Sequence, residues 1–286
     1  DRVVDDAALT RHARVLDLRP GTGLLTWEAV RRTPEGGVWA LAENEPSAEG
    51  LAAAGAGLDP LDRPTVVVGT LDELPTLLAL RGEGDLRFDA IIGRNVLGSA
   101  ADRPALARRM RDLLATGGRL SLAEGVPRRG SRPSALLDPG ALGAALAARL
   151  IAAEALAYGE LPEDAGSVAP ANGDSGSAAS IAALPTGRPG SADPRLAWDE
   201  DDLSAALAAA GLVDVRIAIE VVPTTLLVTP SLVRRWFGPD AAYARQLTAS
   251  LSPEEVARVQ AAFTTISTGE PRPWQTATAF VTARLA

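Results

Sequence analysis

The sequence contains no cysteine and only one histidine, His12. Disulfide bonds, thiolate zinc sites and cysteine nucleophiles are therefore excluded, and a catalytic triad built on histidine has a single candidate base. His12 precedes the first apolar run of the chain, which is a poor position for a general base in a sheet whose ligands bind beyond the strand ends. The chemistry of this chain must rely on other residue types, and we expect no metal site.

Lysine is also absent, so that all 28 basic residues are arginine, and 36 acidic residues outnumber them. The resulting formal net charge of −8 disfavours nucleic acid as a partner of the isolated chain, because nucleic acids bind basic surfaces. No apolar run approaches the length of a membrane span and no signal peptide precedes the fold, so we expect a cytoplasmic protein without membrane contact. The chain begins at Asp1 rather than at methionine, which suggests a fragment of a longer chain.

What the sequence does contain is an alternation of short apolar runs with helix-like segments, over 286 residues that are 47% hydrophobic. This alternation predicts an α/β fold with a doubly wound, mostly parallel sheet and helices on both faces. Seven strands are expected, at residues 13–18, 38–42, 65–68, 88–92, 119–123, 213–222 and 276–285. The pattern alone does not set the direction of the last strand, which we take as antiparallel.

Composition divides the chain into three parts. Residues 1–124 carry the regular alternation and form the expected ligand-binding core. Residues 125–197 form a cap followed by an insertion rich in Pro, Gly, Ser and Ala, which we expect to be disordered because it offers little apolar surface to bury. Residues 198–286 complete the sheet and contain a helical insertion at 230–273.

The most informative stretch runs from Arg14 to Gly23, where an apolar strand ends in a glycine turn and a helix follows. Such a turn presents the unpaired N–H groups of a helix N-terminus to a ligand. A dinucleotide site would require G-x-G-x-x-G, and the chain has Gly21 and Gly23 but Thr26 in place of the third glycine. Hydride transfer is therefore the weaker interpretation of this turn.

Further polar residues follow the next expected strands. Glu43 ends the second strand, with Glu45 as an alternative, and Asp72 follows the third strand, with Thr70 two residues before it. Arg94 and Asn95 end the fourth strand. Together with Asp17 and the paired glycines, this order over residues 13–124 resembles the class I S-adenosylmethionine-dependent methyltransferases, which have a Rossmann-like fold.

The resemblance implies that S-adenosylmethionine is the cofactor and that the chain transfers a methyl group to a small-molecule or protein acceptor, which the sequence does not identify. The residues that it assigns to cofactor binding are Asp17, Arg19, Gly21, Thr22, Gly23, Glu43, Asn44, Leu71, Asp72, Arg94 and Asn95. Methyl transfer needs mainly alignment of the reacting atoms, so no catalytic residue is required, and Arg94 and Asn95 are the only catalytic candidates.

Two departures from the family pattern support a second hypothesis. Arg19 stands where the family has its first glycine, and Thr70 stands in the position of an acid. These changes fit a domain of weakened activity that serves in binding or as a scaffold. The second half of the chain is similar to methyltransferase-like domains fused to replication-associated AAA-type ATPases in some bacteria, so association with an ATPase is the corresponding partner hypothesis.

Purely structural interpretations of these residues compete with the functional ones. Asp17 and the glycines could simply form a tight turn, and Glu43 and Asp72 could be solvated loop acids. A strand-end asparagine such as Asn95 often satisfies backbone groups in a turn. The cluster Arg128, Arg129 and Arg132 is either an anion-binding lip at the cofactor mouth or a solvated loop.

Overall fold

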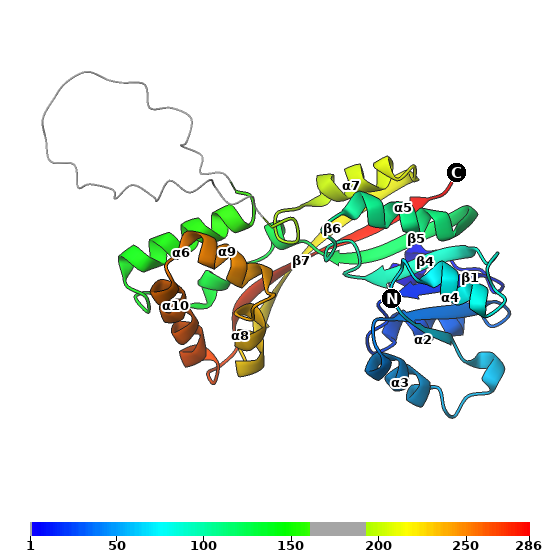
Figure 1. Cartoon of the computed structure of the whole chain (residues 1–286), viewed down its shortest axis with the longest axis horizontal. Coiled ribbons are helices and arrows are strands. Elements are labelled where there is room, and N and C mark those ends of the chain that lie inside the picture. Colours follow the sequence, from blue (N-terminus) through cyan, green and yellow to red (C-terminus); the bar gives the residue numbers. More distant parts are fainter. Residues whose placement is uncertain (1, 161–192) are drawn as a thin grey trace, which may run out of the picture. The chain divides into compact units, whose positions relative to one another are not determined.

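The structure is a computed structural model, and it describes residues 2–160 and 193–286 (Figure 1). The insertion that we predicted to be disordered lies almost wholly outside the described residues. The chain divides into two compact units. Unit 1 comprises residues 1–130, 198–223 and 275–286, and unit 2 comprises residues 131–197 and 224–274.

Seven strands form one mixed sheet in the order β3-β2-β1-β4-β5-β7-β6. Their bounds are β1 Arg14–Leu18, β2 Gly37–Ala42, β3 Thr65–Val68, β4 Phe88–Arg94, β5 Leu114–Gly125, β6 Val213–Leu226 and β7 Arg272–Arg284. The pairs among β1 to β5 are parallel, and β7 runs antiparallel to β5. The predicted doubly wound sheet and its antiparallel last strand are confirmed. The strand order reverses between β1 and β4, and a doubly wound sheet binds its ligand at such a reversal.

Helices pack on both faces of the sheet within unit 1. They are α1 Arg2–Asp6, α2 Leu24–Arg32, α3 Glu45–Ala54, α4 Leu74–Leu80, α5 Arg103–Leu113 and α7 Glu200–Ala209. Val15 packs in one apolar cluster with residues of α1 and α2, whereas its neighbour Leu16 packs in another with residues of α4, α5 and α7. Because successive side chains of a strand point to opposite faces, the two clusters are the two faces of the core.

The start of β5 differs from the expectation. The sequence predicts a glycine stop before a strand at 119–123, whereas β5 begins at Leu114, directly after α5. Gly117 does take the expected left-handed conformation, with φ of 75°. Its N–H also donates to the carbonyl of Leu285 at 3.1 Å, so strand pairing continues through the glycines.

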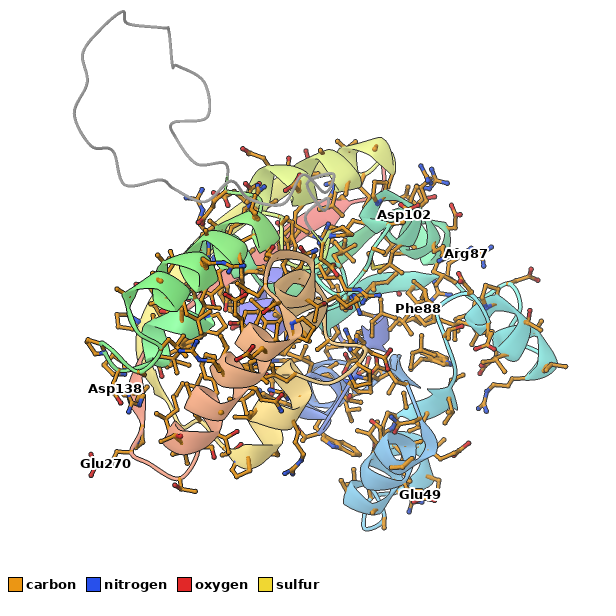
Figure 2. The ribbon with its side chains drawn as sticks, turned by 60° about the vertical axis from the view of Figure 1, so that its left-hand side comes forward. Glu49, Arg87, Phe88, Asp102, Asp138 and Glu270 are labelled. Atoms are coloured by element: carbon orange, nitrogen blue, oxygen red, sulfur yellow. The ribbon has the colours of Figure 1, made fainter. Side chains whose placement is uncertain are left out.

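At the start of β4, Phe88 is fully buried and the neighbouring Arg87 is exposed (Figure 2).

Unit 2 has its own helical core. Its helices are α6 Ala144–Ala157, α8 Pro230–Trp236, α9 Ala242–Ser250 and α10 Pro253–Ile266, and the last three fall in the predicted helical insertion. Leu247 and Phe263 are fully buried in its apolar cluster.

Short 3-10 turns lie in unit 1 at Pro60–Asp62 and Pro127–Arg129, and in unit 2 at Pro133–Leu136. Within residues 2–160 and 193–286, no helix is both long and apolar enough to cross a bilayer.

Candidate functional site

The turn after β1 has the backbone geometry that the glycine pattern predicts. Gly21 and Gly23 have φ of 55° and 86°, which is the left-handed region that glycine enters without steric cost. A Cβ on Gly23 would lie 2.6 Å from a methyl of Leu51 and 2.8 Å from the indole nitrogen of Trp27. Gly23 is therefore required twice, by its conformation and by the close approach of α2 and α3.

Asp17 supports this turn from inside the protein. Its side chain is fully buried, and Oδ2 accepts a hydrogen bond from Thr26 Oγ1 at 2.6 Å, which ties β1 to α2. Oδ1 has no hydrogen-bond partner within the described part of the chain. Burial raises the pKa of Asp17 to about 7, although the hydrogen bonds with Thr26 lower it. The carboxyl thus lies behind the turn and is only partly satisfied by the protein.

Arg19, the departure from the family pattern, also has a left-handed backbone, with φ of 61°. Its Nε lies 2.7 Å from Glu43 Oε1 at the end of β2. Its Nη1 donates to the backbone carbonyl of Asn95, after β4, and to Ser99 Oγ at 2.6 Å. One arginine therefore links the ends of β1, β2 and β4 at the point where the strand order reverses.

Two cavities meet at the ion pair of Arg19 with Glu43, because both residues line both cavities. The first has a volume of about 340 Å³, and its other lining residues are Pro20, Gly21, Thr22, Leu24, Leu25, Ser47, Arg94 and Asn95. The second has a volume of about 300 Å³, and its other lining residues are Leu18, Leu41, Gly69, Thr70, Leu71, Val96, Ser99 and Leu106. The ion pair is thus a shared wall between a polar compartment at the glycine turn and an apolar compartment beside β3. We refer to the two together as the divided cleft.

Seven of the eleven predicted cofactor-binding residues line the divided cleft; Asp17, Gly23 and Asn44 do not, and neither does Asp72. Its carboxylate forms an ion pair with Arg109 of α5, and it lines a separate cavity of about 350 Å³. Thr70 lines the apolar compartment, where its backbone N–H and its hydroxyl donate to Glu73 Oε2, both at 2.8 Å. Leu71 lies between, because it lines both of these cavities.

The two predicted asparagines have structural tasks. Asn44 is the N-cap of α3, and its side chain accepts from the N–H of Ser47 at 3.0 Å. Asn95 has φ of 52°, and its Oδ1 accepts from the N–H of Gly125 at 2.9 Å, which joins the ends of β4 and β5. This contact matches the structural interpretation of Asn95 as a residue that satisfies backbone groups.

Arg94 differs from the other arginine of the cleft. It lines the polar compartment and is exposed, and its guanidinium has no hydrogen bond or ion pair among the described residues. Its guanidinium is therefore available to an anionic group of a ligand, whereas the guanidinium of Arg19 is already engaged.

Sequence reasoning missed Glu124, which shapes the loop after β4. Its side chain is fully buried and accepts from the N–H groups of Val96 at 2.9 Å, Leu97 at 3.0 Å and Gly98 at 2.8 Å. Burial raises the pKa of this carboxyl, and the three hydrogen bonds oppose that rise. The sequence did contain a signal for this role of Glu124. It is an acid at the end of an apolar strand, and the loop after β4 has backbone N–H groups that need acceptors.

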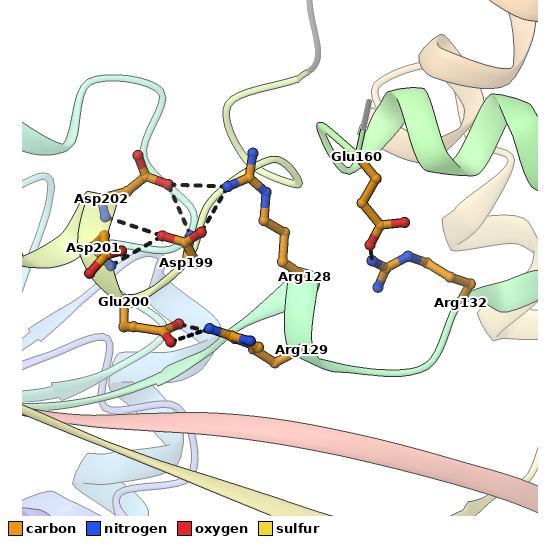
Figure 3. A network of polar contacts seen from close by, with 8 residues as sticks. All are labelled: Arg128, Arg129, Arg132, Glu160, Asp199, Glu200, Asp201 and Asp202. Carbon is orange, nitrogen blue, oxygen red and sulfur yellow. Dashed lines mark hydrogen bonds and ion pairs between the residues drawn. The ribbon is translucent and has the colours of Figure 1, made fainter. Parts of the chain in front are cut away.

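The arginines after β5 pair with acids rather than presenting an open basic surface (Figure 3). In unit 1, Arg128 lies 2.8 Å from Asp199 and 3.8 Å from Asp202, and Arg129 pairs with Glu200. These acids belong to the first turn of α7, where Asp199 is also the N-cap. In unit 2, Arg132 pairs with Glu160. The contacts favour a structural task for this cluster.

His12 lies apart from the divided cleft. Its Nε2 is 3.2 Å from Glu35, and its side chain is 75% exposed. Both residues precede their strands, whereas the cleft follows the strands. Within the described ranges, no group of three His, Cys, Asp or Glu residues could hold a metal ion.

Comparison with known proteins gives structural matches only. No family model and no curated protein sequence matches this chain. The YcgJ protein of Bacillus subtilis is 13% identical, with a TM-score of 0.53, over 99% of this chain and 96% of that one. A candidate methyltransferase from Bacillus halodurans is 12% identical, with a TM-score of 0.52 and the same coverage. The fold is that of the class I S-adenosylmethionine-dependent methyltransferases, and identities this low carry no more than the fold.

Proposed function

We propose that the divided cleft binds S-adenosylmethionine and that the chain is a class I methyltransferase whose acceptor is still to be identified. The observation that carries this proposal is the convergence of the glycine turn, Glu43 and Arg94 at the strand reversal of this fold. No metal or nucleophile is required, because the reaction depends on alignment and on exclusion of water.

The residues of the cleft fit the chemical groups of the donor. Glu43 would accept hydrogen bonds from the ribose hydroxyls, since a carboxylate is an acceptor for two neighbouring donors. The apolar compartment, with Leu41, Leu71 and Leu106, would hold the adenine ring. Arg94 would pair with the carboxylate of the methionine part. When bound, the donor supplies an electrophilic methyl group to a nucleophile placed in line with it.

The fit requires one rearrangement. Arg19 now engages the carboxylate that the ribose would use, and it separates the two compartments. Donor binding therefore requires the guanidinium of Arg19 to leave Glu43. This contact also favours the second candidate, a methyltransferase-like binding or scaffold domain of weakened activity. The partner of such a domain would be an AAA-type ATPase.

Titration calorimetry with S-adenosylhomocysteine separates the two candidates. If the enzyme hypothesis holds, the wild-type chain binds, and Glu43→Gln weakens binding by about 1–3 kcal/mol because buried hydroxyls lose a charged acceptor. Glu49→Gln, in the neighbouring helix α3 and outside the cleft lining, is the matched control and should leave the affinity unchanged. Absence of binding at millimolar ligand in both the wild type and Arg19→Gly would exclude the enzyme hypothesis.

A further inference from the structure

A second cavity, of about 450 Å³, lies in unit 1 away from the divided cleft. Its lining comes from α1, β5, β6 and β7, and consists of Arg2, Asp6, Arg119, Leu120, Asp214, Arg216, Ile217, Ala218, Phe280, Thr282, Ala283 and Arg284. Arg119 begins the part of β5 that runs in register with β4 up to Ala123, so it marks the amino end of that pairing. The divided cleft lies at the carboxyl ends of the strands. We call this second site the arginine cavity.

Charge distinguishes the arginine cavity from the rest of the molecule. Its lining contains four arginines and two aspartates, a formal charge of +2, within a chain of net charge −8. Arg2 is shared between Asp6 and Glu220. Arg284 lies 3.3 Å from Asp214. In the described part of the chain, the guanidinium groups of Arg119 and Arg216 have no hydrogen bond or ion pair, although the backbone of both residues lies in the sheet.

Two of these arginines are cross-strand neighbours, and only one of them has an acidic partner among the described residues. Arg119 and Arg284 are directly opposite each other in the antiparallel register of β5 and β7, and both line the cavity. Cross-strand neighbours have Cβ atoms about 4.5–5.5 Å apart, and like charges in this arrangement repel. Asp214 balances the charge of Arg284, so the unbalanced charge of this pair is that of Arg119, and a bound anion would offset it.

We propose that the arginine cavity binds a small phosphomonoester. Guanidinium groups donate two parallel hydrogen bonds to phosphate oxygens, and Arg119 and Arg216 are the arginines with donors to offer. Phe280, which packs on the same face of the sheet as α1, provides apolar wall for the organic part of the ligand. The volume of about 450 Å³ is within the range of small-molecule sites. A long polyanion is disfavoured because the chain as a whole is acidic. This site does not depend on methyl-donor binding.

The test uses phenyl phosphate as the probe, because it has the phosphate and an apolar body but no adenine that could enter the divided cleft. We expect calorimetric binding to the wild type, and a dissociation constant raised roughly tenfold or more in Arg119→Thr and in Arg216→Ala. Arg108→Ala is the control, because Arg108 lies on α5, against the other face of the sheet, and also has no ion pair among the described residues. It should bind like the wild type.

Thermal unfolding supplies a second measurement that a misfolded variant could not imitate. Since Arg119→Thr removes a charge opposite Arg284, the Tm of the ligand-free protein should be at least that of the wild type, while the stabilisation by phenyl phosphate should fall. A Tm below that of the wild type would overturn the argument. So would an unchanged affinity in Arg119→Thr, an absence of binding at millimolar probe, or tighter binding of a thymidine oligonucleotide through the same arginines.

Discussion

Replacement of Arg19 by glycine is the most direct test of the divided cleft. The substitution removes the guanidinium that engages Glu43, the carbonyl of Asn95 and Ser99, and so removes the wall between the two compartments. It also restores the residue type that the left-handed backbone at this position favours, since φ is 61°. We therefore expect a protein that is as well folded as the wild type but has an open cleft.

The magnitude follows from the contacts that the ligand must otherwise displace. The side chains of Arg19 and Glu43 are 36% and 57% exposed, so solvent screens the ion pair and its contribution is at most about 1 kcal/mol. The hydrogen bonds to Asn95 and Ser99 are also with an exposed side chain, and add about 1 kcal/mol after exchange with water. Arg19→Gly should therefore tighten binding of S-adenosylhomocysteine by about 1–2 kcal/mol, or roughly 5–30-fold.

The assay is titration calorimetry with the wild type, Arg19→Gly and Arg19→Ala side by side. Both variants remove the wall, so both should bind more tightly. Only glycine relieves the left-handed backbone, so Arg19→Gly should be more stable than Arg19→Ala by about 1 kcal/mol in denaturant unfolding. Weaker binding by both variants would refute the reasoning, because it would mean that Arg19 holds the ligand rather than obstructing it.

Three further results are expected. Arg94→Ala should weaken donor-product binding by about 1–2 kcal/mol in the same calorimetric assay, whereas Arg108→Ala should not. Asp17→Asn should become more stable relative to wild type as pH rises from 4 to 7, by on the order of 4 kcal/mol in urea unfolding. Its folded pKa is about 7 against 3.8 unfolded, so the folded wild type retains a proton that the unfolded chain has lost. Gly23→Ala should lower the free energy of unfolding by about 2–3 kcal/mol, because its Cβ would meet Leu51; an unchanged Tm would contradict the packing at the turn.

The pattern of the first 124 residues was sufficient to predict the core of the sheet. Apolar runs with a period suited to buried parallel strands leave few alternatives once helices separate them, and right-handed crossovers then set the arrangement. The start of β5 was placed too late, because the pairing of Gly117 with Leu285 joins residues far apart in the chain. Such pairing leaves no local signal.

The site was predictable to the extent that its residues follow strand ends. Glu43, Gly21 and Arg94 reach the divided cleft because the carboxyl ends of parallel strands share one edge of the sheet. Asp72 satisfied the same rule in sequence, yet its carboxylate pairs with Arg109 of α5. Which way a loop side chain points depends on the charges that packing brings beside it, and these come from distant segments.

The sequence by itself determined the class of fold and the position of the glycine turn after the first strand, because hydrophobic period and glycine spacing are local properties of the chain. It also marked Arg19 as the unusual residue of that turn. Only the tertiary structure showed that Arg19 engages Glu43, that Asp17 is buried behind the turn and that Arg119 faces Arg284. Each of these depends on strand register and on packing between segments remote in sequence, and electrostatic interactions respond to distances that no local pattern encodes.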